Sequence, residues 1–145
     1  MAALTGTNAI AGKNGEVGMQ FTATGTYTLA AALANGDTIT WSNLLPLGGA
    51  KIVAVRFFAP ELDTNATPTM KWTLGNSDDA DGFIIEQGGA VGLSNSLPTM
   101  IVAGGTGALM DTTVTNRNVV FTVTAAVATG ATTGTIRVEF LLEGI

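Results

Sequence analysis

Short segments in which apolar and polar residues alternate run through most of this chain, and glycine-rich stretches separate them. Alternation with a period of two puts the apolar residues of an extended segment on one face, as in a β-strand with one buried side. No segment has the length and period of a stable helix. The segments with strand character are residues 17–29, 38–42, 51–58, 70–74, 83–85, 100–102, 119–125 and 136–142.

These segments predict an all-β fold built from two antiparallel sheets of about eight strands. A jelly roll is the expected arrangement, and an immunoglobulin-like sandwich is the alternative. The last two segments flank the turn 130–134 and are expected to pair as a hairpin. Residues 1–16 are small and polar and show no periodicity, which predicts a flexible N-terminal arm, either free or docked on a neighbour. A single sandwich domain then spans residues 17–145.

The composition excludes several classes of function. The chain has no Cys and no His, so disulfides, thiolate or imidazole metal sites and Ser-His or Cys-His catalysis are not available to it. Its net charge of -5 argues against a nucleic-acid partner and against a polybasic membrane anchor. No apolar run approaches the ~20 residues of a membrane span. We therefore expect neither nucleic acid nor membrane as a partner, and no cofactor.

The surface is expected to carry few charges. Only 12% of the residues are charged, whereas about 25% is typical of soluble domains. Such a composition favours a surface that is covered by other subunits, and hence a homo-oligomer. The first ten residues contain no basic start and no apolar run of signal length, so we expect synthesis in the cytoplasm.

The acidic turn at Asp78, Asp79 and Asp81 is the best candidate for a cation site, because hard cations prefer several oxygen ligands from one loop. If the turn were an EF-hand loop, its closing position would fall on Gly88. That position requires a bidentate Glu, and glycine has no side chain to bind the cation. A solvated acidic turn is therefore the favoured interpretation, and no metal site is predicted.

Other acidic residues allow a weaker hypothesis. A carboxylate pair for glycoside hydrolysis could be drawn from Glu61, Asp63 and Glu86, but nothing in the sequence fixes the separation on which that chemistry depends. We therefore predict no catalytic residues.

Two apolar groups have opposite expected roles. The aromatic residues at alternating strand positions are expected in the core, with an exposed sugar-binding platform as the alternative. They are Phe21, Trp41, Phe57, Trp72, Phe121 and Phe140.

A predicted connection holds an apolar segment, and apolar side chains in a connection are hard to bury within one subunit. The segment consists of Leu44, Leu45, Pro46 and Leu47. This segment is the candidate contact with another subunit or with a capsid; the alternative is that it plugs one end of the sandwich.

Several short motifs follow one another in a characteristic order. They are residues 34–39, 45–46, 50–57, 61–63, 67–69, 78–84, 119–131 and 134–140. This order resembles that of structural proteins of tailed-bacteriophage virions. The resemblance implies a capsid decoration, or cement, protein on the outside of the shell. Such a protein forms dimers or trimers, bridges neighbouring major capsid protein subunits and has neither catalytic residues nor a cofactor.

Two alternatives belong to other functional classes. One is a phage tail or head-fibre domain that binds host-surface glycans, which would need exposed aromatic rings beside acids. The other is a small hydrolase that uses only carboxylates, such as Asp63, Glu86 and Asp111.

Overall fold

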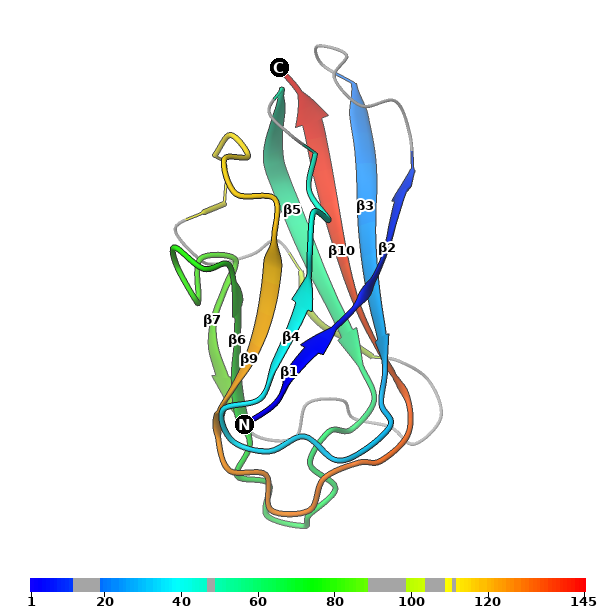
Figure 1. Cartoon of the computed structure of the whole chain (residues 1–145), viewed down its shortest axis with the longest axis vertical. Coiled ribbons are helices and arrows are strands. Elements are labelled where there is room, and N and C mark those ends of the chain that lie inside the picture. The colour runs from blue at the N-terminus through cyan, green and yellow to red at the C-terminus, as the bar shows by residue number, and fades with distance from the viewer. Residues whose placement is uncertain (12–18, 47–48, 89–98, 104–108, 111) are drawn as a thin grey trace.

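In the part of the chain that the computed structural model describes, ten strands form two five-stranded sheets that pack face to face (Figure 1). The structure describes residues 1–11, 19–46, 49–88, 99–103, 109–110 and 112–145. No helix that could cross a membrane occurs among them. The strands are β1 (Ala3–Thr5), β2 (Thr7–Ala11), β3 (Gln20–Thr28), β4 (Thr38–Trp41), β5 (Ala50–Ala59), β6 (Lys71–Gly75), β7 (Ile84–Gly88), β8 (Thr99–Ala103), β9 (Val119–Ala125) and β10 (Thr135–Gly144).

The strands pair in a nested order. One sheet runs β1-β4-β9-β6-β7 and the other runs β2-β3-β10-β5-β8. Outward from the antiparallel β6–β7 pair, β5 pairs with β8, β4 with β9 and β3 with β10, all antiparallel. The chain from β3 onward is thus one long hairpin rolled into two sheets, which is a jelly roll. This confirms the predicted fold class and excludes the immunoglobulin-like alternative.

The predicted hairpin of the last two strands is wrong. β9 pairs with β4 and β6, whereas β10 pairs with β3 and β5 in the other sheet. The connection between them bonds to the loop after β5 instead of closing a tight turn: Thr64 N donates to Thr129 O (2.8 Å) and Ala131 N donates to Leu62 O (3.0 Å). These bonds hold the connection across the end of the sandwich.

The first eleven residues also differ from the prediction of an arm. β1 pairs in parallel with β4 in one sheet, and β2 pairs antiparallel with β3 in the other. Backbone bonds and a buried carboxylate hold this segment, because Ala2 N donates to Asp37 Oδ1 (2.6 Å) and Thr38 N donates to Ala2 O (2.9 Å). Alanine and threonine dominate the segment. Because these residues differ little in hydrophobicity, the sequence shows no clear alternation of apolar and polar residues there. The rest of the predicted arm, residues 12–16, lies outside the described residues.

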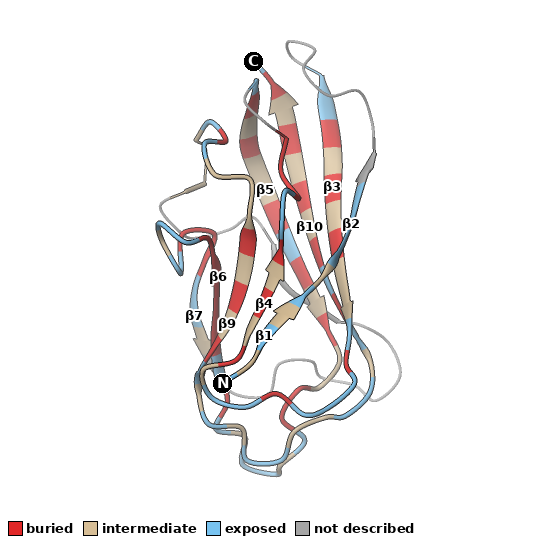
Figure 2. Cartoon of the chain, in the orientation of Figure 1, coloured by how far each residue is buried: buried red, intermediate tan, exposed pale blue. Residues whose placement is uncertain are grey.

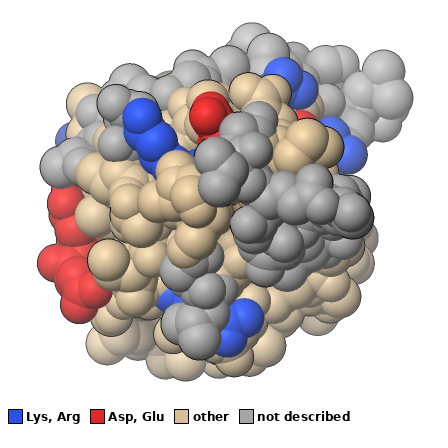
Figure 3. Space-filling view, turned by 90° about the horizontal axis from the view of Figure 1, so that it is seen from above, with Lys and Arg blue, Asp and Glu red and all other residues tan. Residues whose placement is uncertain are grey.

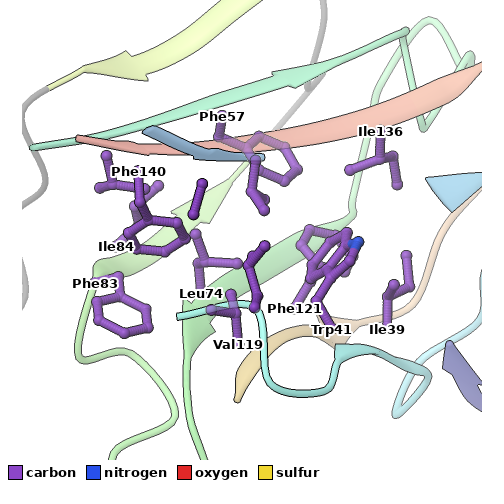
Figure 4. Close-up of a cluster of buried hydrophobic side chains, with 14 of the residues drawn as sticks. Ile39, Trp41, Phe57, Leu74, Phe83, Ile84, Val119, Phe121, Ile136 and Phe140 are labelled. Atoms are coloured by element: carbon purple, nitrogen blue, oxygen red, sulfur yellow. The ribbon is translucent and has the colours of Figure 1, made fainter. Parts of the chain in front are cut away.

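Aromatic rings fill the space between the sheets. Buried and partly exposed positions alternate along β3, β5 and β10, so that one side of each strand faces the core (Figure 2). Phe57 stacks on Trp72 with ring centroids 4.3 Å apart and on Phe121 at 5.4 Å. Aromatic pairs of this kind contribute about 0.5–1.5 kcal/mol beyond the area they bury. Figure 4 shows Phe57 and Phe140 pointing from one sheet toward Leu74 and Phe121 of the other.

The aromatic residues predicted to be core are all buried. The exposed fraction is 0% for both Trp41 and Trp72. Neither tryptophan can therefore form the exposed glycan-binding platform that was the alternative. The other confirmed core aromatics are Phe21, Phe57, Phe121 and Phe140.

Trp41 joins the two sheets where the chain crosses between β1 and β2. Its Nε1 donates to Thr26 O of β3 (3.0 Å), and the crossing residue Gly6 donates its N–H to Thr40 O (2.8 Å). A Cβ at Gly25 would lie 2.6 Å from Trp41 Cδ1, and a Cβ at Gly6 would overlap the same indole. Glycine is thus required at both positions because the backbone itself lies against the ring.

Substitution of Gly25 by Ala tests this packing. We expect Gly25→Ala to lower the free energy of unfolding by about 1–3 kcal/mol, because the buried indole must shift to admit a methyl group. Urea unfolding followed by tryptophan fluorescence measures the change. Thr24→Ala, at the adjacent outward position, is the control and should cost less than about 1 kcal/mol. A Gly25→Ala variant as stable as the wild type would contradict the packing described here.

Candidate functional site

The outer face of the β2-β3-β10-β5-β8 sheet carries most of the charged side chains described on the strands. We call it the charged face. Arg56 Nη1 lies 3.4 Å from Glu139 Oε1, and the Arg137 guanidinium lies 4.2 Å from the centre of the Phe58 ring. These charges thus have partners within the sheet, as expected of a face that lies in water. The ionisable residues at its outward positions are Lys51, Arg56, Arg137, Glu139 and Glu143.

The outer face of the opposite sheet has a different composition. The outward positions of its strands β4, β6 and β9 alternate with fully buried residues such as Ile39 and Phe121. The register places Thr38 beside Thr122, and Thr122 beside Thr73, so threonines lie side by side across three strands. We call this surface the threonine face. Its centre consists of the outward residues Thr38, Thr40, Val120 and Thr122, none of which is ionisable, with Thr73 buried beneath the surface at 7% exposed. Lys71, at another outward position of β6, lies at its edge.

An ion pair marks the β6–β7 edge of the threonine face. Lys71 Nζ lies 3.5 Å from Glu86 Oε1, and Thr124 Oγ1 donates to Glu86 Oε2 (2.7 Å). The Thr124 hydroxyl and then the Lys71 ammonium lower the pKa of Glu86 from its usual value. Both members of the pair are exposed, so the pair contributes little to stability.

The acidic turn folds back over β6 at another border of the threonine face. A Cβ at Gly75, which pairs with Val120, would meet the backbone of Asp79 and Ala80. Asn76 Oδ1 accepts the N–H groups of Asp78 (2.9 Å) and Asp79 (3.0 Å). Figure 3 shows acidic atoms gathered at the left edge of the molecule, the side on which the β6–β7 turn lies in Figure 1.

The carboxylates of this turn lie close enough to interact. A hydrogen bond with Asp79 raises the pKa of Asp81 above its usual value, as expected when two like charges share a site. Asn116 Nδ2 donates to Asp78 Oδ2 (3.0 Å). Within the described ranges, no group of three or more Asp or Glu side chains is arranged to hold a metal ion.

Asp63 has a structural role that the sequence analysis missed. Its carboxylate is fully buried and accepts backbone N–H groups from two loops. Oδ2 accepts from Thr69 (2.9 Å) and Met70 (3.1 Å) of its own loop, and Oδ1 accepts from Thr129 (3.0 Å) of the β9–β10 connection. A further bond to Oδ2 comes from Ala128 N (3.1 Å). Asp63 therefore ties the two loops together at this end of the sandwich.

The same contacts determine the ionisation of Asp63. Burial raises its pKa, but the N–H groups of Thr129, Ala128, Thr69 and Met70 outweigh burial and hold the pKa well below the usual 3.8. The carboxylate is occupied by these bonds and is not free to act as an acid or base in the hypothetical pair with Glu61 or Glu86. The cue in the sequence is the spacing of Asp63 and Asn65 in a polar loop, which is typical of an Asx-turn.

The predicted contact segment lies in the connection between β4 and β5. Leu44 and Leu45 are fully buried, and Pro46 is also buried. The Leu45 N–H donates to Arg117 O (3.0 Å), while Arg117 Nε donates to Leu45 O (2.9 Å). This burial favours the alternative that the segment plugs one end of the sandwich; contact with a partner stays a prediction. Leu47 lies outside the described residues, as does Asp111.

Comparison with solved structures finds phage capsid chains. A chain of the cyanophage Pam1 capsid asymmetric unit superposes with a TM-score of 0.69 and 27% identity, over 93% of this chain and 91% of that chain. A chain of the capsid of Ralstonia phage GP4 has a TM-score of 0.66 and 19% identity, over 94% and 92% of the two chains. No family model matches the sequence, and no curated protein matches it. The chain is thus a jelly-roll protein similar over nearly its whole length to chains of phage capsids.

Removal of the Asp63 charge tests the structural role of this residue. We expect Asp63→Asn to lower the free energy of unfolding at pH 7 by about 2–3 kcal/mol, because an NH2 group replaces an acceptor that faces N–H donors. The folded chain favours the carboxylate, so its contribution is present above the usual pKa of 3.8 and is lost as the pH falls below it.

Wild type should therefore lose more stability than Asp63→Asn between about pH 5 and about pH 3. Chemical denaturation at each pH measures this difference. Glu61→Gln, two residues away, serves as the control and should keep the behaviour of the wild type. Identical stability of Asp63→Asn and wild type throughout this range would contradict the assignment.

Proposed function

We propose that this chain is a virion structural protein that decorates and stabilises a bacteriophage capsid. In this proposal it lies on the outer surface of the shell and bridges neighbouring major capsid protein subunits. The observation that carries the proposal is the superposition on a chain of the cyanophage Pam1 capsid asymmetric unit, at a TM-score of 0.69 over 93% of this chain. The order of motifs in the sequence supports the same assignment.

The architecture suits such a role. The sheets offer two outer faces, and a stack of buried aromatic rings packs between them. A stable protein interface buries about 1,600 Å² in total. A decoration protein repeats its contact at every equivalent position of the shell, so contacts of a few kcal/mol each together resist the internal pressure of the mature shell. Copies that associate as homodimers or homotrimers would add further joints between capsid subunits.

We further propose that the chain has no catalytic activity. The sequence contains neither His nor Cys, and the buried Asp63 carboxylate is engaged by backbone N–H groups of two loops. In this proposal the protein is made in the cytoplasm of the bacterial host and is then incorporated into the virion.

Binding to isolated shells tests the proposed function. We expect the purified chain to bind saturably to expanded, mature shells that lack this protein, and only weakly to unexpanded precursor shells. Expansion changes the spacing of neighbouring subunits. A bridging protein must contact two subunits at once, so its affinity depends on that spacing. Co-sedimentation over a range of protein concentrations measures both affinities. Equal binding to the two kinds of shell, or binding to neither, would contradict the proposal.

A further inference from the structure

We propose that the threonine face is the surface that docks on the shell, and that its partner there is a protein surface with an uncharged centre and Lys or Arg side chains at its border. This inference rests on the proposed virion function and assigns the contact to one side of the molecule. It follows from the unequal charge of the two outer faces and from the position of the acidic turn.

The first argument is the absence of charge from the centre of the threonine face; the Lys71–Glu86 pair lies at its β6–β7 edge. A face in contact with water carries about 25–35% charged residues, whereas the centre of a protein interface is depleted of them. The charged face has an ionisable residue at most outward positions of β10, such as Arg137, Glu139 and Glu143. The outward positions of β4 and β9 on the threonine face, by contrast, hold only Thr and Val. The threonine face therefore has the composition of an interface centre.

The second argument concerns the cost of covering each face. To dock the charged face, the chain would have to desolvate Arg56 and Glu139, and two charges taken from water are seldom fully compensated by each other. Threonine hydroxyls and methyl groups cost much less to desolvate. Val120 adds apolar surface at the middle strand of the threonine face. Docking through this face thus meets the smaller penalty.

The acidic turn identifies the kind of partner. Asp78, Asp79 and Asp81 border the threonine face, and the ion pairs seen among the described residues, Arg56–Glu139 and Lys71–Glu86, leave these three aspartates without a basic partner. Carboxylates at the rim of an interface attract a partner with basic groups at the matching rim. A second copy of this chain, with a net charge of -5, is a poorer match than a shell surface that carries Lys or Arg.

Two arginine substitutions separate the faces. Thr122→Arg places a charge at the centre of the threonine face, and Thr24→Arg places the same charge on the outward side of β3 on the charged face. Both threonines are partly exposed, so both variants should fold, and their unfolding midpoints verify this. In the co-sedimentation assay with mature shells we expect Thr122→Arg to weaken binding by at least about tenfold and Thr24→Arg to change it less than about threefold. Thr38→Arg, on β4 beside Thr122, should reproduce the loss if Thr122→Arg does not fold.

Neutralising the turn tests the partner. The triple variant Asp78→Asn, Asp79→Asn and Asp81→Asn should bind shells more weakly at low salt and lose most of the salt dependence of the wild type. Unchanged or tighter binding of this variant would overturn the inference that the partner carries Lys or Arg side chains at its border.

The remaining outcomes distinguish the two proposals. A loss of binding with Thr24→Arg but not with Thr122→Arg overturns the docking face while leaving the virion function intact. If Thr122→Arg dissociates an oligomer of the chain and still binds shells, the threonine face belongs to a second copy and the inference is wrong. If the wild-type chain binds no shell, both proposals fail.

Discussion

The closure of two sheets around one layer of aromatic rings is the constraint on which the rest of the structure depends. Phe57, Trp72 and Phe121 stack between the sheets, and Trp41 ties them together where the chain crosses at Gly6. Each sheet can bury only one of its faces in this way. The nested pairing of the strands then leaves two outer faces and two ends, and the loops at the ends must find their own bonds, as they do around the Asp63 carboxylate.

The two outer faces that result are chemically unequal. Paired charges and a cation–π contact cover one face, and threonines with Val120 cover the centre of the other, which has the Lys71–Glu86 pair at its edge. A sandwich in which one face has an uncharged centre suits a protein that lies flat on a larger assembly, because that face is the less costly one to remove from water. The fold itself is similar to that of chains in two phage capsids.

Large apolar residues with a period of two predicted strands β3, β4, β6, β9 and β10 and their buried aromatics, and short continuous apolar runs predicted β5, β7 and β8. β1 and β2 escaped prediction because Ala3, Thr5, Thr7 and Ala9 have almost no apolar contrast. The pairing of β9 with β10 was predicted wrongly because only the turn between them was considered, and the partners that replace it are distant in sequence. The role of Asp63 depends on two loops that meet only in the folded chain.

A density map of the virion tests the central claim most directly, because it locates every copy of this chain. The account predicts jelly-roll density on the exterior of the shell, over joints between major capsid subunits, with strands β4, β6 and β9 facing the shell. It is contradicted if the head contains no such density, or if strands β3, β5 and β10 face the shell instead.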